Sequence, residues 1–239
     1  MNKLQNIPDK KLIHLIEACR ISYSISEHSY ENLYQALHKF NDHEQKFDLS
    51  IYLNAWSLID SLHRFGDCIK NVRGFSHKDE RYKSFSSYLL EINIFRNYMQ
   101  HLSAPKTSIK LMSDDTYPVM GALTWSLDGS ISRTIAYGTL PVGTNFNTLG
   151  YDTEIGKYLT DIKIGCLDKE LSLMKSIELA KICYLYFEEF LISSSYISNE
   201  KLDASKIIMR TSDIKAIIER PEVNTKERYI RVQVKVSAQ

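Results

Sequence analysis

Glycine and proline are scarce in this chain, which has only 9 glycines and 5 prolines among its 239 residues. Collagen-like repetition is therefore excluded, and a hydrophobic fraction of 44% excludes intrinsic disorder. The net charge of +1 argues against a protein that coats nucleic acid non-specifically, although a local basic site remains compatible with it. A chain of this length buries a sizeable core without disulfide or metal staples.

The patterns that mark metal sites, membrane spans and leader peptides are also missing. The 4 cysteines form no CxxC or Cys/His ligand spacing, so we expect reduced thiols in a cytosol and no zinc site. The most apolar run, Ile182 to Phe187, is far shorter than the roughly 20 residues that a membrane span needs. The N-terminal segment has the spacing of a helix face, not of a signal peptide. We expect a cytoplasmic protein that enters no membrane.

Hydrophobic periodicity predicts four long amphipathic helices, over residues 9–40, 47–72, 81–102 and 169–193. Short connections between the early helices favour an up-and-down bundle. The buried stripe expected in the second helix is Ile51, Ala55, Leu58, Ile59, Leu62, Phe65 and Ile69. The buried side expected in the third helix is Phe85, Leu89, Ile92, Phe95 and Met99.

Capping residues predict where these helices begin and where the first one breaks. Ser24 or Ser26 is a candidate cap for a break within the first helix. Asp48 or Ser50 is expected to cap the second helix, and Asp168 the fourth.

A change of period predicts a small antiparallel sheet between the third and fourth helices. Residues 119–127 and 131–137 alternate apolar with small or polar side chains around Asp128-Gly129, a dipeptide typical of two-residue hairpin turns. Residues 158–167 favour a further strand. The fold class is therefore mainly α (α+β), with a β insertion at about 117–167.

The C-terminal segment, 199–239, predicts an α/β tail that packs on the sheet or on the bundle formed by 1–198. It contains a short helix near 212–219 and alternating valines and isoleucine over 230–236. Its nine basic residues against six acidic ones favour either an ordinary solvated surface or one wall of a nucleic-acid cleft.

The third helix ends with a cation, an amide and an imidazole within six residues: Arg96, Asn97 and His101. Asn97 and His101 are four apart and share a helix face, and Arg96 lies one step of about 100° from Asn97. Arginine presents a planar fork of donors suited to phosphate, and histidine moves a proton near neutral pH. The three side chains therefore predict a site for a phosphate ester.

At these residues the sequence resembles the HEPN superfamily of helical-bundle proteins, whose motif is Arg, commonly followed by Asn, His or Asp, and then His several residues on. Arg96-Asn97-xxx-His101 matches that motif. The resemblance covers the helices and implies a metal-independent endoribonuclease without a cofactor. It further implies a homodimer acting on RNA, often as a toxin or in antiviral defence. The sheet insertion and the tail have no counterpart in it.

If the site is catalytic, His101 acts as general base or general acid, Arg96 neutralises charge on the phosphate oxygens, and Asn97 orients the imidazole or donates to the same oxygens. The structural alternative is that Arg96 pairs with Asp60 or Glu91 while His101 caps the helix. Two non-enzymatic functions also remain open. One is a HEPN-like module that dimerises or binds a protein partner such as a nucleotidyltransferase-type antitoxin, and the other is a scaffold whose sheet edge binds a peptide.

Other candidate residues each have two interpretations. His63 and Asp67, one turn apart with Asp60 nearby, are part of a metal site or a polar face of paired side chains. Residues 77–80 favour a solvated turn. Base stacking, or packing in the core or in a dimer interface, is open for three aromatic residues of the fourth helix: Tyr184, Tyr186 and Phe187.

Overall fold

The computed structural model describes residues 9–39, 49–100, 117–127, 131–136, 159–167 and 169–196. These residues form four helices: α1 (Lys10–Lys39), α2 (Ser50–Ile69), α3 (Glu80–Gln100) and α5 (Leu173–Ser193). They also form four strands: β1 (Tyr117–Leu127), β2 (Ile131–Ala136), β3 (Leu159–Leu167) and β4 (Lys169–Ser172). The expected class, mainly helical with a small antiparallel sheet inserted between two helices, is confirmed.

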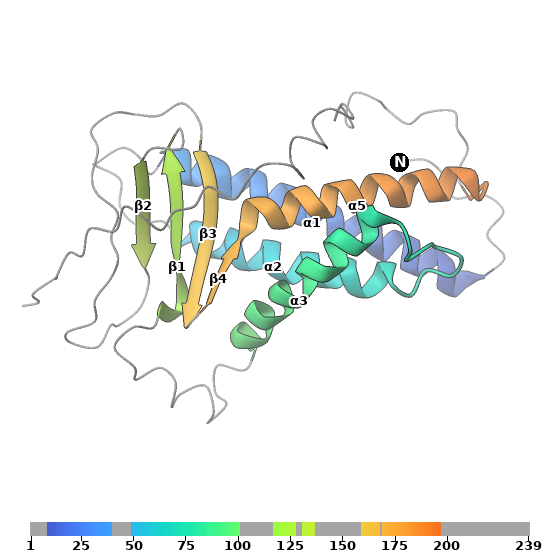
Figure 1. Ribbon diagram of the computed structural model, residues 1–239, viewed down its shortest axis with the longest axis horizontal. Helices are drawn as coiled ribbons and strands as arrows, with labels where there is room; N and C mark the ends of the chain where they lie inside the picture. The colour runs from blue at the N-terminus through green and yellow to red at the C-terminus, as the bar shows by residue number, and fades with distance from the viewer. Residues whose placement is uncertain are drawn as a thin grey trace, which may run out of the picture.

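The sheet stands at one end of the helices (Figure 1). Its strand order is β2-β1-β3-β4, and every neighbouring pair is antiparallel. Helices α1 and α3 run toward the sheet, whereas α2 and α5 run away from it, and α3 crosses the others obliquely (Figure 1). This arrangement places the C-terminal end of α3 beside α2, near the end of the molecule that carries the sheet.

Helix α2 lies in the core, and the stripe expected for it is confirmed, since all seven of its residues are buried. On α3, Phe85, Ile92 and Phe95 are buried as expected, and Leu89 and Met99 are partly buried against the same core. Gly66 permits a close approach between the two helices, because a Cβ atom there would fall on the Leu89 side chain.

The structure corrects two expectations about the early helices. Helix α1 continues without a break through Ser24 and Ser26. The Ser26 hydroxyl donates to the Tyr23 carbonyl at 2.7 Å, so it is satisfied inside the helix and does not cap a new one. Helix α2 begins after Leu49, which makes no side-chain capping bond, and Asp48 lies outside the described residues.

The fourth helix of the sequence, α5, begins at Leu173 and not at residue 169, which is a further correction. Residues 169–172 pair with β3 as strand β4, with Leu171 opposite Ile164. Ser172 is the N-cap, and its hydroxyl accepts a hydrogen bond from the Lys175 amide at 3.2 Å. Asp168, the expected cap, lies outside the described residues.

The two strands of the expected hairpin pair as β1 and β2, with Leu127 opposite Ile131, although their Asp128-Gly129 turn lies outside the described residues. The expected strand at 158–167 is confirmed as β3. The sheet is fixed to α2 by Tyr52, whose hydroxyl contacts the carbonyls of Gly121 at 3.2 Å and Ile135 at 3.1 Å.

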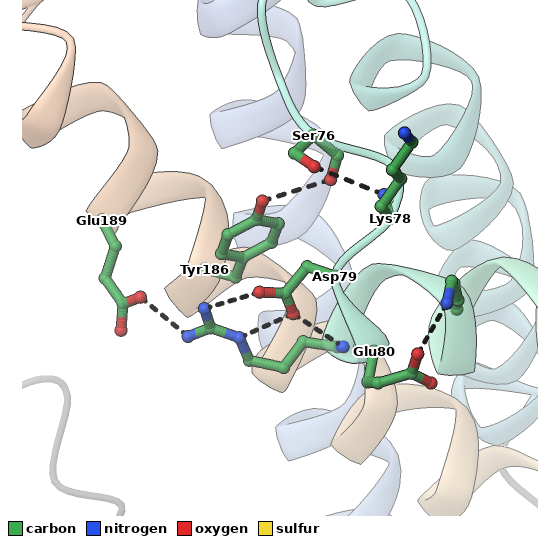
Figure 2. Close-up of polar contacts among 8 residues, drawn as sticks. Ser76, Lys78, Asp79, Glu80, Tyr186 and Glu189 are labelled. Atoms are coloured by element: carbon green, nitrogen blue, oxygen red, sulfur yellow. Dashed lines mark hydrogen bonds and ion pairs between the residues drawn. The ribbon is translucent and has the colours of Figure 1, made fainter.

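Residues 77–80 are largely exposed, as expected of a solvated turn, and the connection between α2 and α3 is in addition held against α5 by polar contacts. Arg81 donates two hydrogen bonds of 3.0 Å to Asp79 and one of 2.7 Å to Glu189. Its guanidinium lies 4.3 Å from the centre of the Tyr186 ring, and the Tyr186 hydroxyl donates to the Ser76 carbonyl (Figure 2). The start of α3 is therefore fixed in place.

The expected tail at 199–239, with its helix and strand, lies outside the described residues. Within the part of the chain that the structure describes, no helix has the length and apolar character needed to cross a membrane.

Candidate active site

Arg96 and Asn97 lie in the last turns of α3, where Arg96 approaches α2 and Asn97 is exposed. Arg96 Nε is 4.0 Å from Asp60 Oδ1, and Arg96 Nη1 donates to Asn97 Oδ1 at 3.4 Å. The Arg96 side chain is 28% exposed, and Asn97 is exposed. His101, the third residue of the motif, lies outside the described residues. The structure thus brings together two of the three predicted site residues and adds Asp60.

Arg96 is held much more loosely than three other arginines of the helices. Arg20, Arg64 and Arg81 each donate to a carboxylate at 2.7 or 2.8 Å. Asp60 illustrates the contrast, because it accepts a 2.7 Å hydrogen bond from Arg64 while it stays at the outer limit of an ion pair with Arg96. A guanidinium in this state keeps its donor fork available for an oxyanion.

The structural alternative for Arg96 is therefore met only in part. Its contact with Asp60 exists but is long, and no ion pair joins it to Glu91 within the described segments. Arg96 is thus paired more weakly than Arg20, Arg64 and Arg81.

Three buried polar atoms of the described residues lack a hydrogen-bond partner, and all three lie along the contact between α2 and α3: His63 Nδ1, Asn93 Oδ1 and Arg96 Nε. Asp60 meets Arg96 at one level of this contact and Gly66 meets Leu89 at another. His63 and Asn93 occupy the positions in between. Because buried polar groups are normally satisfied, these three atoms make this stretch more polar than the surrounding core.

A pocket of about 260 Å³ opens beside Arg96. Its apolar walls come from Leu53, Trp56 and Ile59 of α2 and Met99 of α3. Its polar lining residues are Ser57, Asp60, Arg96 and Gln100. The site therefore combines a cation with an apolar recess large enough for one planar ring.

The His63 and Asp67 pair forms a polar helix face. His63 Nδ1 is 3.1 Å from Asp67 Oδ2 without the geometry of a hydrogen bond, Asp67 also binds Lys70, and Asp60 binds Arg64. Across the described ranges, no group of three or more His, Cys, Asp or Glu side chains is arranged to hold a metal ion.

The three aromatic residues of α5 serve packing. Tyr184 stacks on Tyr23 of α1 with ring centres 4.0 Å apart, and Phe187 is completely buried. Tyr186 lies against Phe75 and under the Arg81 guanidinium. Their faces are occupied by neighbours, so the core interpretation is confirmed for this segment.

Sequence reasoning missed Trp56 and Asn93. Asn93 lies three residues before Arg96 on a helix whose other inward residues are apolar, and that spacing was the available indication. Trp56 was not separable from the core stripe of α2, because its part in the pocket depends on where α3 crosses.

No protein-family model, curated protein or solved structure matches this chain. What the site does chemically therefore has to follow from its own residues.

Proposed function

We propose that this chain is an endoribonuclease of the HEPN type that cuts RNA without a metal ion, as a homodimer in the cytoplasm, in a toxin–antitoxin or phage-defence role. The observation that carries the proposal is the guanidinium of Arg96, which lies next to Asn97 and a pocket and which no carboxylate of the described residues binds closely. The resemblance of Arg96-Asn97-xxx-His101 to the HEPN motif supports the same conclusion.

In this mechanism Arg96 binds the scissile phosphate and neutralises the charge that grows on its oxygens in the transition state. Asn97, one residue further along the helix, donates to the same oxygens or holds an imidazole. His101 removes the proton from the ribose 2′-hydroxyl, or returns a proton to the leaving 5′ oxygen. A reaction that uses the 2′-hydroxyl as the attacking group leaves DNA intact.

The pocket beside Arg96 suits a base next to the scissile phosphate. Its walls of leucine, tryptophan, isoleucine and methionine side chains offer apolar contact to a ring, while Asp60 and Gln100 offer hydrogen bonds to the ring edge. A flat base held there fixes the phosphate relative to Arg96, which is the positioning that phosphodiester cleavage requires.

A second copy of the chain would dock on the exposed face of α3. Leu90 is 68% exposed, and Asn97, seven residues later, lies on the same face two turns further on. If the two α3 helices pack in parallel with Leu90 against its counterpart, the two copies of the Arg96-Asn97 pair lie on the same side of the contact, so that the acid and base roles can be divided between the subunits.

The test is cleavage of a structured RNA and of the same sequence as DNA, both in excess EDTA. Wild type should cut the RNA and spare the DNA, and His101→Ala should lose about 10²- to 10⁴-fold in rate. His28→Ala is the matched control, since His28 is an exposed histidine of α1, and it should behave as wild type. Cleavage of DNA, or full activity in His101→Ala, would refute the proposal. Absence of any cleavage by a folded wild type would favour the non-catalytic partner-binding module.

A further inference from the structure

Helix α1 turns two isoleucines outward and three serines inward. Ile21 and Ile25 are 63% and 47% exposed, whereas Ser22, Ser26 and Ser29 are at most 6% exposed. The hydroxyls of Ser26 and Ser29 are hydrogen-bonded within the fold. Buried hydroxyls beside exposed isoleucines reverse the ordinary distribution of polar and apolar side chains. The two isoleucines lie one turn apart, so they form one apolar ridge on the outer face of the helix.

Charged and polar side chains extend this ridge in both directions. Its exposed members, in chain order, are His14, Glu17, Ile21, Ile25, His28 and Glu31. Steps of three or four residues place all of them on one face, with the spacing that two helices need to pack side by side. The pocket beside Arg96 is lined by residues of α2 and α3, so this face is separate from the candidate active site.

The order of these residues is complementary to itself when it is read in the opposite direction. If a second α1 lies antiparallel with its Ile25 against Ile21, Glu17 opposes His28 of the second copy and His14 opposes Glu31 of the second copy. All three pairs are centred on residues 22–23, so one register satisfies them together. A two-fold axis repeats each pair, which gives apolar contact in the middle and four pairs of histidine with glutamate around it.

The same residues disfavour a parallel pair. In that arrangement Glu17 and Glu31 would each face their own counterparts, and like charges across an interface suppress association. In the antiparallel pair each carboxylate faces an imidazole, which donates an N–H group in either protonation state. For His28 the donor is Nδ1, because the Asn32 amide nitrogen, 3.0 Å away, donates to Nε2.

We propose that the outer face of α1 docks a second copy of this chain in antiparallel orientation, through Ile21 and Ile25 and the flanking glutamate and histidine pairs. The contact does not depend on the proposed nuclease activity, and it is distinct from the contact through Leu90 of α3. A chain that has two different two-fold contacts assembles beyond a dimer.

The test is sedimentation velocity of the full chain over a protein concentration series into the high micromolar range, with Leu90→Asp present throughout to remove the α3 contact. Leu90→Asp alone should dimerise as its concentration rises. Addition of Ile21→Asp and Ile25→Asp should leave a folded monomer at every concentration, as checked by circular dichroism. Leu49→Asp, at an exposed leucine of α2, is the matched control and should still dimerise.

Two outcomes of this experiment would overturn the proposal. One is a Leu90→Asp chain that stays monomeric, and if wild type then forms dimers, the α3 contact alone joins the copies. The other is a Leu90→Asp dimer that survives Ile21→Asp and Ile25→Asp, because the second copy must then bind elsewhere.

Cross-linking tests the direction of the two helices. Glu17→Cys and His28→Cys chains are mixed and treated with a short bismaleimide, both with Cys68→Ser, since the other three native cysteines are buried. The mixture should give dimers linked between positions 17 and 28. Each chain alone should give few, because positions 17 of two antiparallel copies lie about 16 Å apart along the helix axis. Efficient linkage of Glu17→Cys chains to one another would contradict the antiparallel contact.

Discussion

Replacement of Arg20 by methionine should destabilise the fold strongly, because Arg20 neutralises a buried carboxylate. Arg20 donates to both oxygens of Glu188 at 2.7 and 2.8 Å, and their side chains are only 12% and 9% exposed. Methionine keeps most of the apolar stem but leaves Glu188, among the described residues, with only the hydroxyl of Tyr184 as a hydrogen-bond donor. Removal of one partner from a buried ion pair costs about 3–5 kcal/mol. For a chain of this size, that loss lowers the melting temperature by roughly 6–20 °C.

The assay is urea unfolding followed by circular dichroism, with Lys83→Met as the control. Lys83 pairs with Glu80 on the surface, where the two side chains are 53% and 81% exposed, and such pairs contribute about 0–1 kcal/mol. The double variant Arg20→Met, Glu188→Met should recover most of the lost stability, because no buried charge is then left unpaired. If Arg20→Met costs no more than Lys83→Met, the buried pair does not hold α1 to α5 as argued.

Three further predictions concern the contacts that place α3 and α5. Gly66→Ala should lower the free energy of unfolding by about 1–3 kcal/mol, because the new methyl group clashes with Leu89. Leu89→Ala in the same chain should relieve part of that loss. If urea unfolding shows that the stability losses of the two substitutions simply add, the clash is contradicted. In the same assay, Ser172→Ala should lower the free energy of unfolding by about 0.5–2 kcal/mol, because the N-cap of α5 is lost. Ser87→Ala, at an exposed position of α3, should lower it much less. Asp79→Asn should be most destabilising near neutral pH. The hydrogen bond from Arg81 lowers the pKa of Asp79. The contribution of ionised Asp79 to the free energy of unfolding is therefore fully present above the ordinary carboxylate pKa and is lost as the pH falls through the lowered pKa. Urea midpoints that differ from wild type by the same amount at neutral and acid pH would argue against that linkage.

The helices were predictable from sequence because their hydrophobic periodicity is strong. The errors lie at positions where a local preference for a helix start or a cap competes with another hydrogen-bonding partner. Residues 169–172 favour a helix start by composition, yet they add a strand to β3, since the backbone groups of β3 gain a partner there. Ser24 and Ser26 looked like caps, but hydroxyls inside a helix also bond to a carbonyl one turn back. Neither outcome depends on the local sequence alone.

For the candidate site, too, part could be predicted from the sequence and part could not. Arg96 and Asn97 were visible as a motif because adjacent residues on a helix have a known angular separation. Their surroundings were not visible, because the loose contact with Asp60 and the pocket with Trp56 depend on the crossing of α2 and α3.

The most direct test of the central claim, that Arg96 is the phosphate-binding group of a metal-free ribonuclease, compares two arginines under single-turnover conditions. Cleavage of one structured RNA in excess EDTA should fall about 10²- to 10³-fold in Arg96→Ala, as expected for the loss of a donor to transition-state charge. Arg73, an exposed residue between α2 and α3, provides the matched change of charge, and Arg73→Ala should cut at the wild-type rate. Equal rates for wild type and both variants would contradict the role assigned to Arg96.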